Sequence, residues 1–329
     1  MDVSLFLMGA RGETYEDVLQ RADRAEELGF RRVVLAERHF RHHDLLLPSP
    51  LTVAGAIAAR TSRIRIGVFG RVLSLDHPVH IAEDAATVDV LSGGRFDFGA
   101  ARASLDEESH AAFESPPAES EARFDEALDV ILRAWTSDEL SHDGAYFRFP
   151  TLAVFPRPVQ RPHPPVFVMA VSDGRLSYAA SRGYNAVVGA LAPVARVAET
   201  HERFESARVD NGAQLHVNRF VHVGESDEQA REQLAEPFAA FMHERAPDLR
   251  AVLEDRHGGA LPSFERMTED FLVVGSPETV VTRLSELQTH AGIESILVTL
   301  DFVTLDQAAS RRSLELFGRH VLPELATAA

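Results

Sequence analysis

Polar side chains that can bind ligands or move protons follow several short apolar runs of this sequence. They lie at residues 37–44, 70–71, 76–78, 102 and 172–175. The preceding runs are rich in Val, Ile, Leu and Phe, which is typical of buried strands. In an α/β barrel the carboxyl ends of the strands meet at one face, where the active site lies. We therefore expect these groups to share one site.

Two of these groups suit a phosphate. Ser172-Asp173-Gly174-Arg175 opens a predicted helix, whose first turn offers a hydroxyl and backbone N–H groups without acceptors. Arg102 follows the neighbouring predicted strand and can donate charge-assisted hydrogen bonds to the same ligand. Each also has a structural interpretation, in which Ser172 serves only as a helix N-cap and Arg102 only as an ion-pair partner.

A metal site is an alternative for the loop after the second strand. His39, His42, His43 and Asp44 could supply imidazole and carboxylate ligands for a hydrolase. Against this interpretation, all four lie on one loop, which also carries arginines. The chain has no cysteine, no glycine-rich nucleotide-binding motif and no G-x-S-x-G nucleophile motif. A bound cofactor that performs the chemistry is therefore favoured, with no metal.

Short apolar runs and helical patterns alternate along almost the whole chain. We predict strands at residues 3–8, 32–36, 64–69, 96–101, 166–170, 185–189, 215–223 and 295–299. Helices are predicted near residues 14–28, 50–60, 78–91, 173–182, 194–209, 226–244, 277–290 and 305–320. Eight strand–helix units predict an α/β fold, a (β/α)8 TIM barrel formed by residues 1–329 as one domain. An open doubly wound sheet is the alternative.

Two segments exceed the usual loop length and are treated as insertions before strand five and before strand eight. Residues 137–165 contain Asp143-Gly144 and several prolines, which predicts a small hairpin followed by an extended approach to the next strand. Residues 246–275 contain Gly258-Gly259 and show no clear periodicity. Long loops in compact domains are often lids, so we expect this second insertion to be one.

Composition restricts the partners and the compartment. The chain has 33 Lys and Arg against 50 Asp and Glu, a net charge of −17, so a nucleic-acid partner is not expected. The apolar N-terminal run lacks the basic region of a signal peptide. No apolar run reaches the length of a membrane span, so we expect no membrane partner and a cytoplasmic location.

Several of these segments, in order along the chain, resemble bacterial luciferase-like, flavin-dependent monooxygenases. Val34-Leu35-Ala36-Glu37-Arg38-His39-Phe40 is similar to the Glu-His-His-Phe segment of that family. The similarity continues through Leu45-Leu46, His77-Pro78-Val79, Leu91–Gly99, Val166–Ser172 and Val274–Glu278. The resemblance thus covers nearly the whole chain and supports the barrel.

The resemblance implies an enzyme that binds FMN at the strand carboxyl ends. Reduced FMN, supplied by a separate flavin reductase, would react with O2 to oxidise an organic small molecule, and the Glu-Arg-His-Phe form of the segment resembles a branch of the family found in natural-product metabolism. The resemblance also implies a homodimer. By position in the family, the FMN-binding residues are Phe69, Gly70, Arg102, Ala170, Val171, Ser172 and Arg175. Phe69-Gly70 aligns with a non-proline cis peptide of the family, a bond that costs about 3–4 kcal/mol.

The catalytic residues implied by the resemblance are Arg38 and His39. Arg38 replaces the first histidine of the family segment, and a guanidinium cannot exchange protons near neutral pH as an imidazole can. Arg38 can instead stabilise an anion. Ala101 stands where the family has a reactive cysteine. Light emission from an aldehyde is therefore not expected.

Two alternatives on the same fold stay open from the sequence. One is a deazaflavin-dependent oxidoreductase that transfers hydride without oxygen. The other is a non-catalytic relative that binds flavin.

Overall fold

The computed structural model describes residues 1–8, 12–40, 47–102, 107–244, 247–302 and 304–327. These residues divide into two compact units. The central unit comprises the described residues of 34–42 and 47–169, and the terminal unit those of 1–33 and 170–329. The expectation of a single domain stays a prediction.

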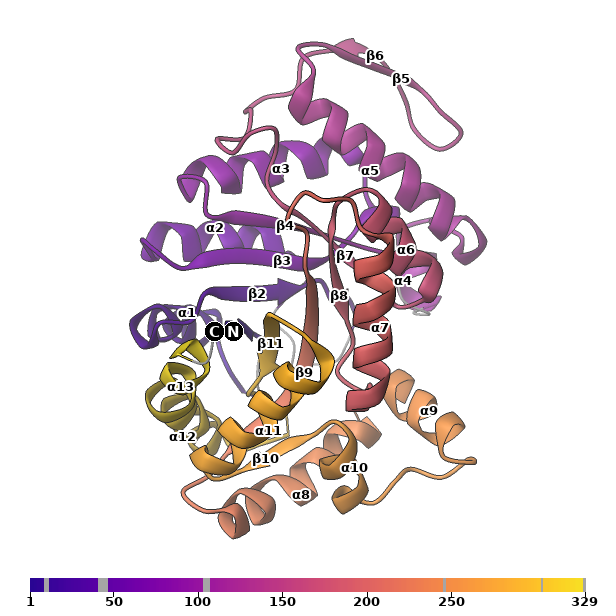
Figure 1. Ribbon diagram of the computed structural model, residues 1–329. Helices are drawn as coiled ribbons and strands as arrows, with labels where there is room; N and C mark the ends of the chain where they lie inside the picture. Colours follow the sequence, from indigo (N-terminus) through magenta and orange to yellow (C-terminus); the bar gives the residue numbers. More distant parts are fainter. Residues whose placement is uncertain (9–11, 41–46, 103–106, 245–246, 303, 328–329) are drawn as a thin grey trace. The chain divides into compact units, whose positions relative to one another are not determined.

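Eight parallel strands form a closed barrel surrounded by helices (Figure 1). The strands are β1 (Asp2–Phe6), β2 (Arg32–Ala36), β3 (Arg65–Val72), β4 (Phe96–Ala101), β7 (Val166–Met169), β8 (Asn185–Val188), β9 (Leu215–Val223) and β11 (Ser295–Thr299). Their order is β9-β11-β1-β2-β3-β4-β7-β8, and β8 pairs with β9. The predicted barrel and its eight strands are confirmed, and the open sheet is wrong.

The helices of the central unit pack against its strands and against one another. They are α2 (Pro50–Arg60), α3 (Pro78–Leu91), α4 (Glu107–Ala112) and α5 (Ser120–Thr136). Helices α2 and α3 lie side by side along β3 and β4, and α5 packs on α3 (Figure 1). The apolar residues of α5 recur every three or four positions, at Phe124, Leu128, Ile131 and Trp135, and are all buried. This helix is not among those predicted from the sequence.

The insertion before β7 contains the predicted hairpin. Strands β5 (Leu140–Asp143) and β6 (Arg148–Leu152) pair antiparallel. The carboxylate of Glu126 on α5 accepts hydrogen bonds from the turn, including one from the Phe147 N–H at 2.9 Å. This carboxylate therefore ties the hairpin to the helix beneath it.

A bulge interrupts the pairing of β3 with β4. Val68 pairs with Phe98, but the next pair is Arg71 with Ala100, so one extra residue lies in β3 between them. The predicted end of this strand at Phe69 is wrong, because the strand resumes after the bulge and continues to Val72. A bulge changes the side of the sheet to which the following side chains point.

The terminal unit contains the other helices. They are α1 (Tyr15–Leu28), α6 (Asp173–Ser181), α7 (Val194–Ala207), α8 (Asp227–Glu244), α9 (Pro247–Arg256), α10 (Phe264–Asp270), α11 (Pro277–Ala291), α12 (Gln307–Leu316) and α13 (Leu322–Thr327), with a π-helical turn at Phe317–Val321. The helix predicted near residues 14–28 is confirmed as α1. Thr14 forms a capping box with Asp17, and Gly29 ends the helix in the left-handed conformation.

The insertion before β11 is folded rather than a long loop. It forms α9, α10 and the short strand β10 (Val273–Gly275), which pairs parallel with the end of β9. Met267 of α10 and Leu253 of α9 are buried in one apolar cluster with Phe238 of α8. Burial of these apolar residues stabilises helices whose sequence shows little periodicity. That this insertion acts as a lid stays a prediction.

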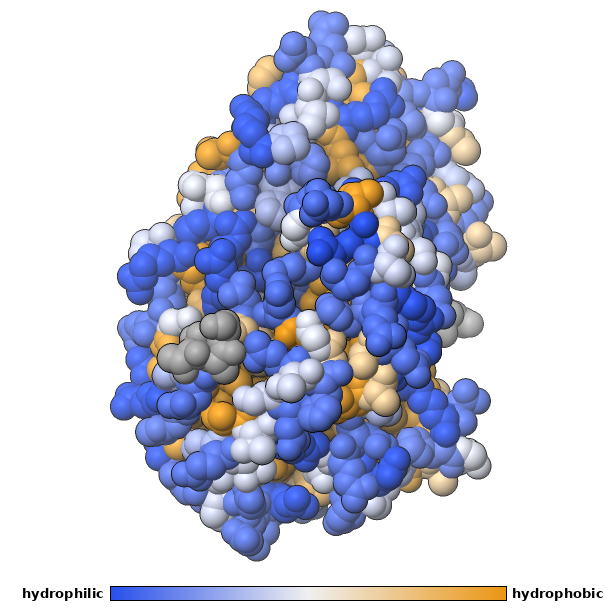
Figure 2. All heavy atoms as spheres, viewed as in Figure 1, coloured by the Kyte–Doolittle hydropathy of each residue, from blue (hydrophilic) through white to orange (hydrophobic). Residues whose placement is uncertain are grey.

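Hydrophilic residues cover most of the face shown in Figure 2, with apolar residues in small groups among them. This distribution fits a chain in which 25% of the residues are charged. None of the described helices has the length and apolar character needed to cross a membrane.

Candidate active site

A buried carboxylate lies at the centre of the polar cluster after β2. Glu37 directly follows this strand, and only 2% of its side chain is exposed. Its Oε2 accepts hydrogen bonds from Nη1 of Arg71 at 2.6 Å and from the Val72 N–H at 2.9 Å. Its Oε1 lies 2.6 Å from Nε2 of His39. Both carboxylate oxygens therefore have partners, and all of these residues belong to the central unit.

The surroundings of Glu37 keep it ionised. Burial alone would raise the pKa of its carboxyl group, because desolvation disfavours the charged form. The hydrogen bond to His39, the charge of Arg71 and the Val72 N–H outweigh that penalty, so the pKa of Glu37 lies below its ordinary value. Arg71 also contacts the carboxylate of Asp76 through Nη2, which places one guanidinium between two carboxylates.

Arg71 is brought to Glu37 by the β3 bulge. The Gly70 carbonyl accepts a hydrogen bond from the Glu37 N–H at 3.2 Å, so β2 and β3 approach closely just before the two side chains meet. A Cβ on Gly70 would lie 2.7 Å from the Cβ of Ala36, too close for any larger residue without movement. From the sequence, Arg71 is identified only as a polar residue after the third strand. Its pairing with Glu37 depends on the bulge, for which Gly70 is the only local signal.

A pocket of about 310 Å³ opens beside this cluster, within the central unit. Its apolar walls are Pro48, Pro50, Leu51, Leu75 and Phe113, and its polar walls are Glu37, His39, Ser49, Thr52, Arg71, Asp76 and Asp84. Converging polar groups beside apolar walls can orient a small molecule and supply it with apolar contact area. The pocket lies at the carboxyl ends of β2 and β3, the end at which barrel enzymes bind their substrates.

The two predicted catalytic residues have different surroundings. The His39 ring lines the pocket, with 15% of its side chain exposed, and meets the Phe113 ring edge-on at 4.7 Å between centroids. Arg38 is exposed and is not among the residues that line this pocket, and its backbone N–H donates to the Leu47 carbonyl at 3.1 Å. The geometry thus favours His39. His42, His43 and Asp44 of the metal hypothesis lie outside the described residues.

The expected cis peptide at Phe69-Gly70 is wrong. Among the described residues, the cis bonds are Phe155-Pro156 and Arg161-Pro162. The backbone here forms the bulge instead, and Gly70 is needed for its close approach to Ala36. The Phe69 ring is buried and stacks on Phe167 at 4.2 Å, so its side chain fills the core. That Phe69 and Gly70 contact the cofactor stays a prediction, and the contacts would have to come from their backbone atoms.

The predicted phosphate-binding turn starts α6 in the terminal unit. Ser172 is the N-cap, and its Oγ accepts a hydrogen bond from the Arg175 N–H at 3.3 Å, as the structural interpretation predicts. Ser172, Asp173 and Gly174 are exposed. The N–H groups of Asp173 and Gly174 lie in the first turn, where a helix has no acceptor of its own. The Asp173 carboxylate pairs with Arg203 at 2.6 Å, which offsets its charge.

The neighbouring predicted residues differ in exposure. The Ala170 N–H donates to the Val187 carbonyl at 2.9 Å, and Ala170 is buried. Val171 has 76% of its surface exposed, which is unusual for a valine. Arg175 is buried, with its guanidinium 4.9 Å from the centroid of the Tyr178 ring. The serine turn fits a phosphate better than the Arg175 side chain does.

Arg102 directly follows β4 in the central unit, as predicted. Its side chain is 42% exposed, and Nη1 lies 3.4 Å from a carboxylate oxygen of Glu121. Such an exposed pair contributes little stability, so the guanidinium can exchange Glu121 for another anion at low cost. The prediction that Arg102 binds phosphate stays untested.

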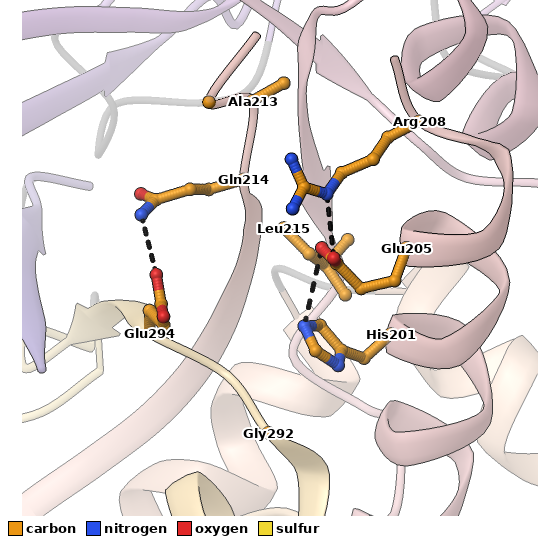
Figure 3. A pocket seen from close by; sticks show the side chains of 9 residues that line it. His201, Glu205, Arg208, Ala213, Gln214, Leu215, Gly292 and Glu294 are labelled. Carbon is orange, nitrogen blue, oxygen red and sulfur yellow. Dashed lines mark hydrogen bonds and ion pairs between the residues drawn. The ribbon is translucent and has the colours of Figure 1, made fainter. Parts of the chain in front are cut away.

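A second pocket, of about 200 Å³, lies in the terminal unit (Figure 3). Glu205 of α7 lies between Arg208, at 2.7 Å, and His201, at 3.9 Å, while Gln214 donates to Glu294 at 3.0 Å. Gln214 and Glu294 directly precede β9 and β11. This pocket is therefore at the amino ends of the strands, the face that in such barrels contributes stability rather than catalysis.

Together the barrel and the pocket beside Glu37 define a class of (β/α)8-barrel enzyme with its polar site at the strand carboxyl ends. Residues 1–294 match the model of the luciferase-like monooxygenase family, and the chain belongs to this family of flavin-dependent enzymes. The predicted family is confirmed.

Individual relatives agree with this assignment. The chain is 25% identical over 342 residues to the alkanal monooxygenase alpha chain of Photobacterium leiognathi, covering 95% of both sequences. The monooxygenase RslO1 of Streptomyces bottropensis superposes with a TM-score of 0.84 at 26% identity, over 98% of this chain and 99% of that one. The oxygenating constituent of 3,6-diketocamphane monooxygenase of Pseudomonas putida, in complex with FMN, has a TM-score of 0.84 at 19% identity and covers 98% of both. The last similarity shows the fold alone.

Proposed function

We propose that this protein is an FMN-dependent monooxygenase that uses reduced flavin and O2 to oxidise an organic small molecule. Family membership supports flavin-dependent oxidation, and the FMN complex of the Pseudomonas putida protein supports FMN as the flavin. When bound, reduced FMN supplies the electrons that activate O2. The exposed N-terminal turn of α6 is the observation that most supports a phosphorylated flavin.

That turn can bind the FMN phosphate through groups with no competing partner in the helix. The backbone N–H groups of Asp173 and Gly174 and the hydroxyl of Ser172 are donors, and the helix dipole adds positive potential. A Cβ on Gly174 would meet only Ser172 Oγ within 4 Å, so there is room for an anion close to the backbone. Arg102 is proposed as a further phosphate ligand on the basis of the family resemblance, as are backbone contacts of Ala170 and Val171.

The substrate pocket is the cavity beside Glu37 and His39. Its acidic walls, Asp76 and Asp84, disfavour an anionic substrate, while Leu51, Leu75 and Phe113 supply apolar contact area. We therefore propose a neutral, partly apolar organic molecule. Catalysis is assigned to His39, which lines the pocket. Arg38 is proposed from the family resemblance alone as a second group that stabilises negative charge.

Three further properties are part of the proposal. A separate flavin reductase would supply reduced FMN, a proposal supported by the similar Pseudomonas putida protein, which is the oxygenating constituent of its monooxygenase. The protein would act as a homodimer, as the family resemblance implies. It would work in the cytoplasm, where a reductase and reduced nicotinamide nucleotides are available.

The reaction of reduced flavin with O2 tests this function. FMN reduced without oxygen is mixed with the protein and then with O2, and flavin reoxidation is followed by its absorbance. We expect the rate of flavin reoxidation to change with protein concentration and to reach a plateau. Binding of FMN without any effect on this rate would favour the non-catalytic relative. An effect on a reduced deazaflavin cofactor, and none on FMN, would favour the deazaflavin-dependent oxidoreductase.

A further inference from the structure

The hydrogen bonds of Glu37 determine which nitrogen of His39 carries a proton. Two donors other than His39 hold the Glu37 carboxylate in its charged form: Arg71 Nη1 lies 2.6 Å from Oε2, and the Val72 N–H donates to the same oxygen at 2.9 Å. An ionised carboxylate can only accept hydrogen bonds. The 2.6 Å contact between Glu37 Oε1 and His39 Nε2 is therefore a hydrogen bond in which Nε2–H is the donor.

The other ring nitrogen is left for a ligand. In neutral imidazole one nitrogen bears the proton and the other a lone pair, so a proton on Nε2 places the lone pair on Nδ1. Among the described residues, no hydrogen bond to Nδ1 of His39 is present, and the ring lines the pocket. A carboxylate that orients a histidine in this way is the arrangement of a hydrolase triad, in which the carboxylate fixes the tautomer and does not itself take up a proton.

The charge of the cluster also suits proton uptake. Glu37 and Asp76 contribute two negative charges and Arg71 one positive charge, a formal sum of −1 for three residues in contact. A proton that arrives on His39 brings the four residues to a formal charge of zero. The positive charge of Arg71 stabilises the ionised form of Glu37. The carboxylate therefore stays a hydrogen-bond acceptor and does not take the proton from His39.

We propose that Glu37 and Arg71 are positioning residues that hold His39 as the Nε2–H tautomer, with Nδ1 as the proton acceptor for a substrate hydroxyl. The O–H bond of the substrate breaks, its proton forms a bond to Nδ1, and the electron pair stays on the substrate oxygen. The resulting imidazolium keeps its Nε2–H hydrogen bond to Glu37. The role in oxidation rests on the proposed monooxygenase function, whereas the tautomer rests on the hydrogen bonds alone. The substrate class is thereby narrowed to neutral organic molecules that carry an ionisable hydroxyl, such as a phenol or an enol.

The protonation of both ring nitrogens can be measured directly. Protein labelled with ¹⁵N-histidine is studied by long-range ¹H–¹⁵N correlation spectra near neutral pH, and the His39→Gln variant identifies the signals of His39. We expect a protonated Nε2 and an unprotonated Nδ1. A proton on Nδ1, alone or together with one on Nε2, would overturn the proposal.

The matched variants test whether Glu37 is the cause. In Glu37→Gln an amide can donate to Nε2, so we expect a substantial shift of the ring population toward the Nδ1–H tautomer. Glu83→Gln, the same substitution on the neighbouring helix α3, should leave the His39 signals unchanged. If Glu37→Gln does not fold, Glu37→Asp replaces it, because the shorter side chain withdraws the acceptor. An unchanged tautomer in the folded variant would refute the role of Glu37. None of these spectra needs flavin, so failure here and failure of FMN to bind are separate results.

Discussion

Replacement of Arg71 by methionine tests how strongly the buried Glu37 depends on its cationic partner. The substitution keeps an unbranched, flexible stem but removes the guanidinium and its Nη1 hydrogen bond of 2.6 Å to Glu37, whose side chain is 2% exposed. Glu37 then keeps the Val72 N–H and His39 as partners but loses the opposite charge. Breaking a buried pair by removal of one partner costs about 3–5 kcal/mol, because the remaining charge is uncompensated. Since Arg71 is still 10% exposed, we expect a value near the lower end, about 3 kcal/mol.

Urea unfolding at pH 7 measures this loss, and a double-mutant cycle shows its origin. Glu37→Gln removes the charge that Arg71 neutralises, so the double variant should be more stable than the sum of the single effects predicts. The coupling free energy should be about 1–3 kcal/mol, as for residues in direct contact. A loss below about 1 kcal/mol for Arg71→Met, or strict additivity of the two changes, would refute the reasoning.

Three other outcomes follow from the same structure. Arg102→Ala should weaken FMN binding by about 1.5–3 kcal/mol, roughly 10- to 150-fold in the dissociation constant measured by fluorescence, whereas the exposed Arg133→Ala should not change it. Gly70→Ala should lower the free energy of unfolding by about 1–3 kcal/mol, because its Cβ would lie 2.7 Å from that of Ala36; an unchanged thermal midpoint would contradict this close approach. Burial lowers the pKa of His216 from 6.5 to about 3. Between these two pH values the unfolded state binds a proton on this histidine and the folded state does not. The free energy of unfolding should therefore fall as the pH decreases from about 6.5 toward 3. Between pH 6 and 4 its slope against pH should be shallower in His216→Gln by about 1.4 kcal/mol per pH unit, and equal slopes would contradict the buried neutral state.

The barrel was predictable because its strands are short, continuous apolar runs that alternate with amphipathic helices. Such strands are buried on both faces, and local signals such as Thr14 and Gly29 mark where a helix begins and ends. Helices α9 and α10 were not predictable, because they are stabilised by burial of Leu253 and Met267 in a cluster formed by distant residues. Helix α5 could have been found from the spacing of its apolar residues.

The candidate site was predictable in part. The position of Glu37 and His39 after a strand indicated the active-site end of the barrel, and the residue types indicated proton chemistry. The contact between Glu37 and Arg71 depends on one extra residue in β3, which reverses the expected side-chain alternation. Strand patterns assume regular pairing, so they predict a bulge poorly. The cis peptide inferred by resemblance failed at the same place, where Phe69 and Gly70 form the bulge.

Equilibrium titration of the purified protein with FMN tests the central claim most directly, because the proposed chemistry requires a phosphorylated flavin to bind. Calorimetry with oxidised FMN, and with reduced FMN under exclusion of oxygen, should show saturable binding, and riboflavin, which lacks the phosphate, should bind more weakly. Absence of saturable binding for both redox states of FMN would contradict the proposed function.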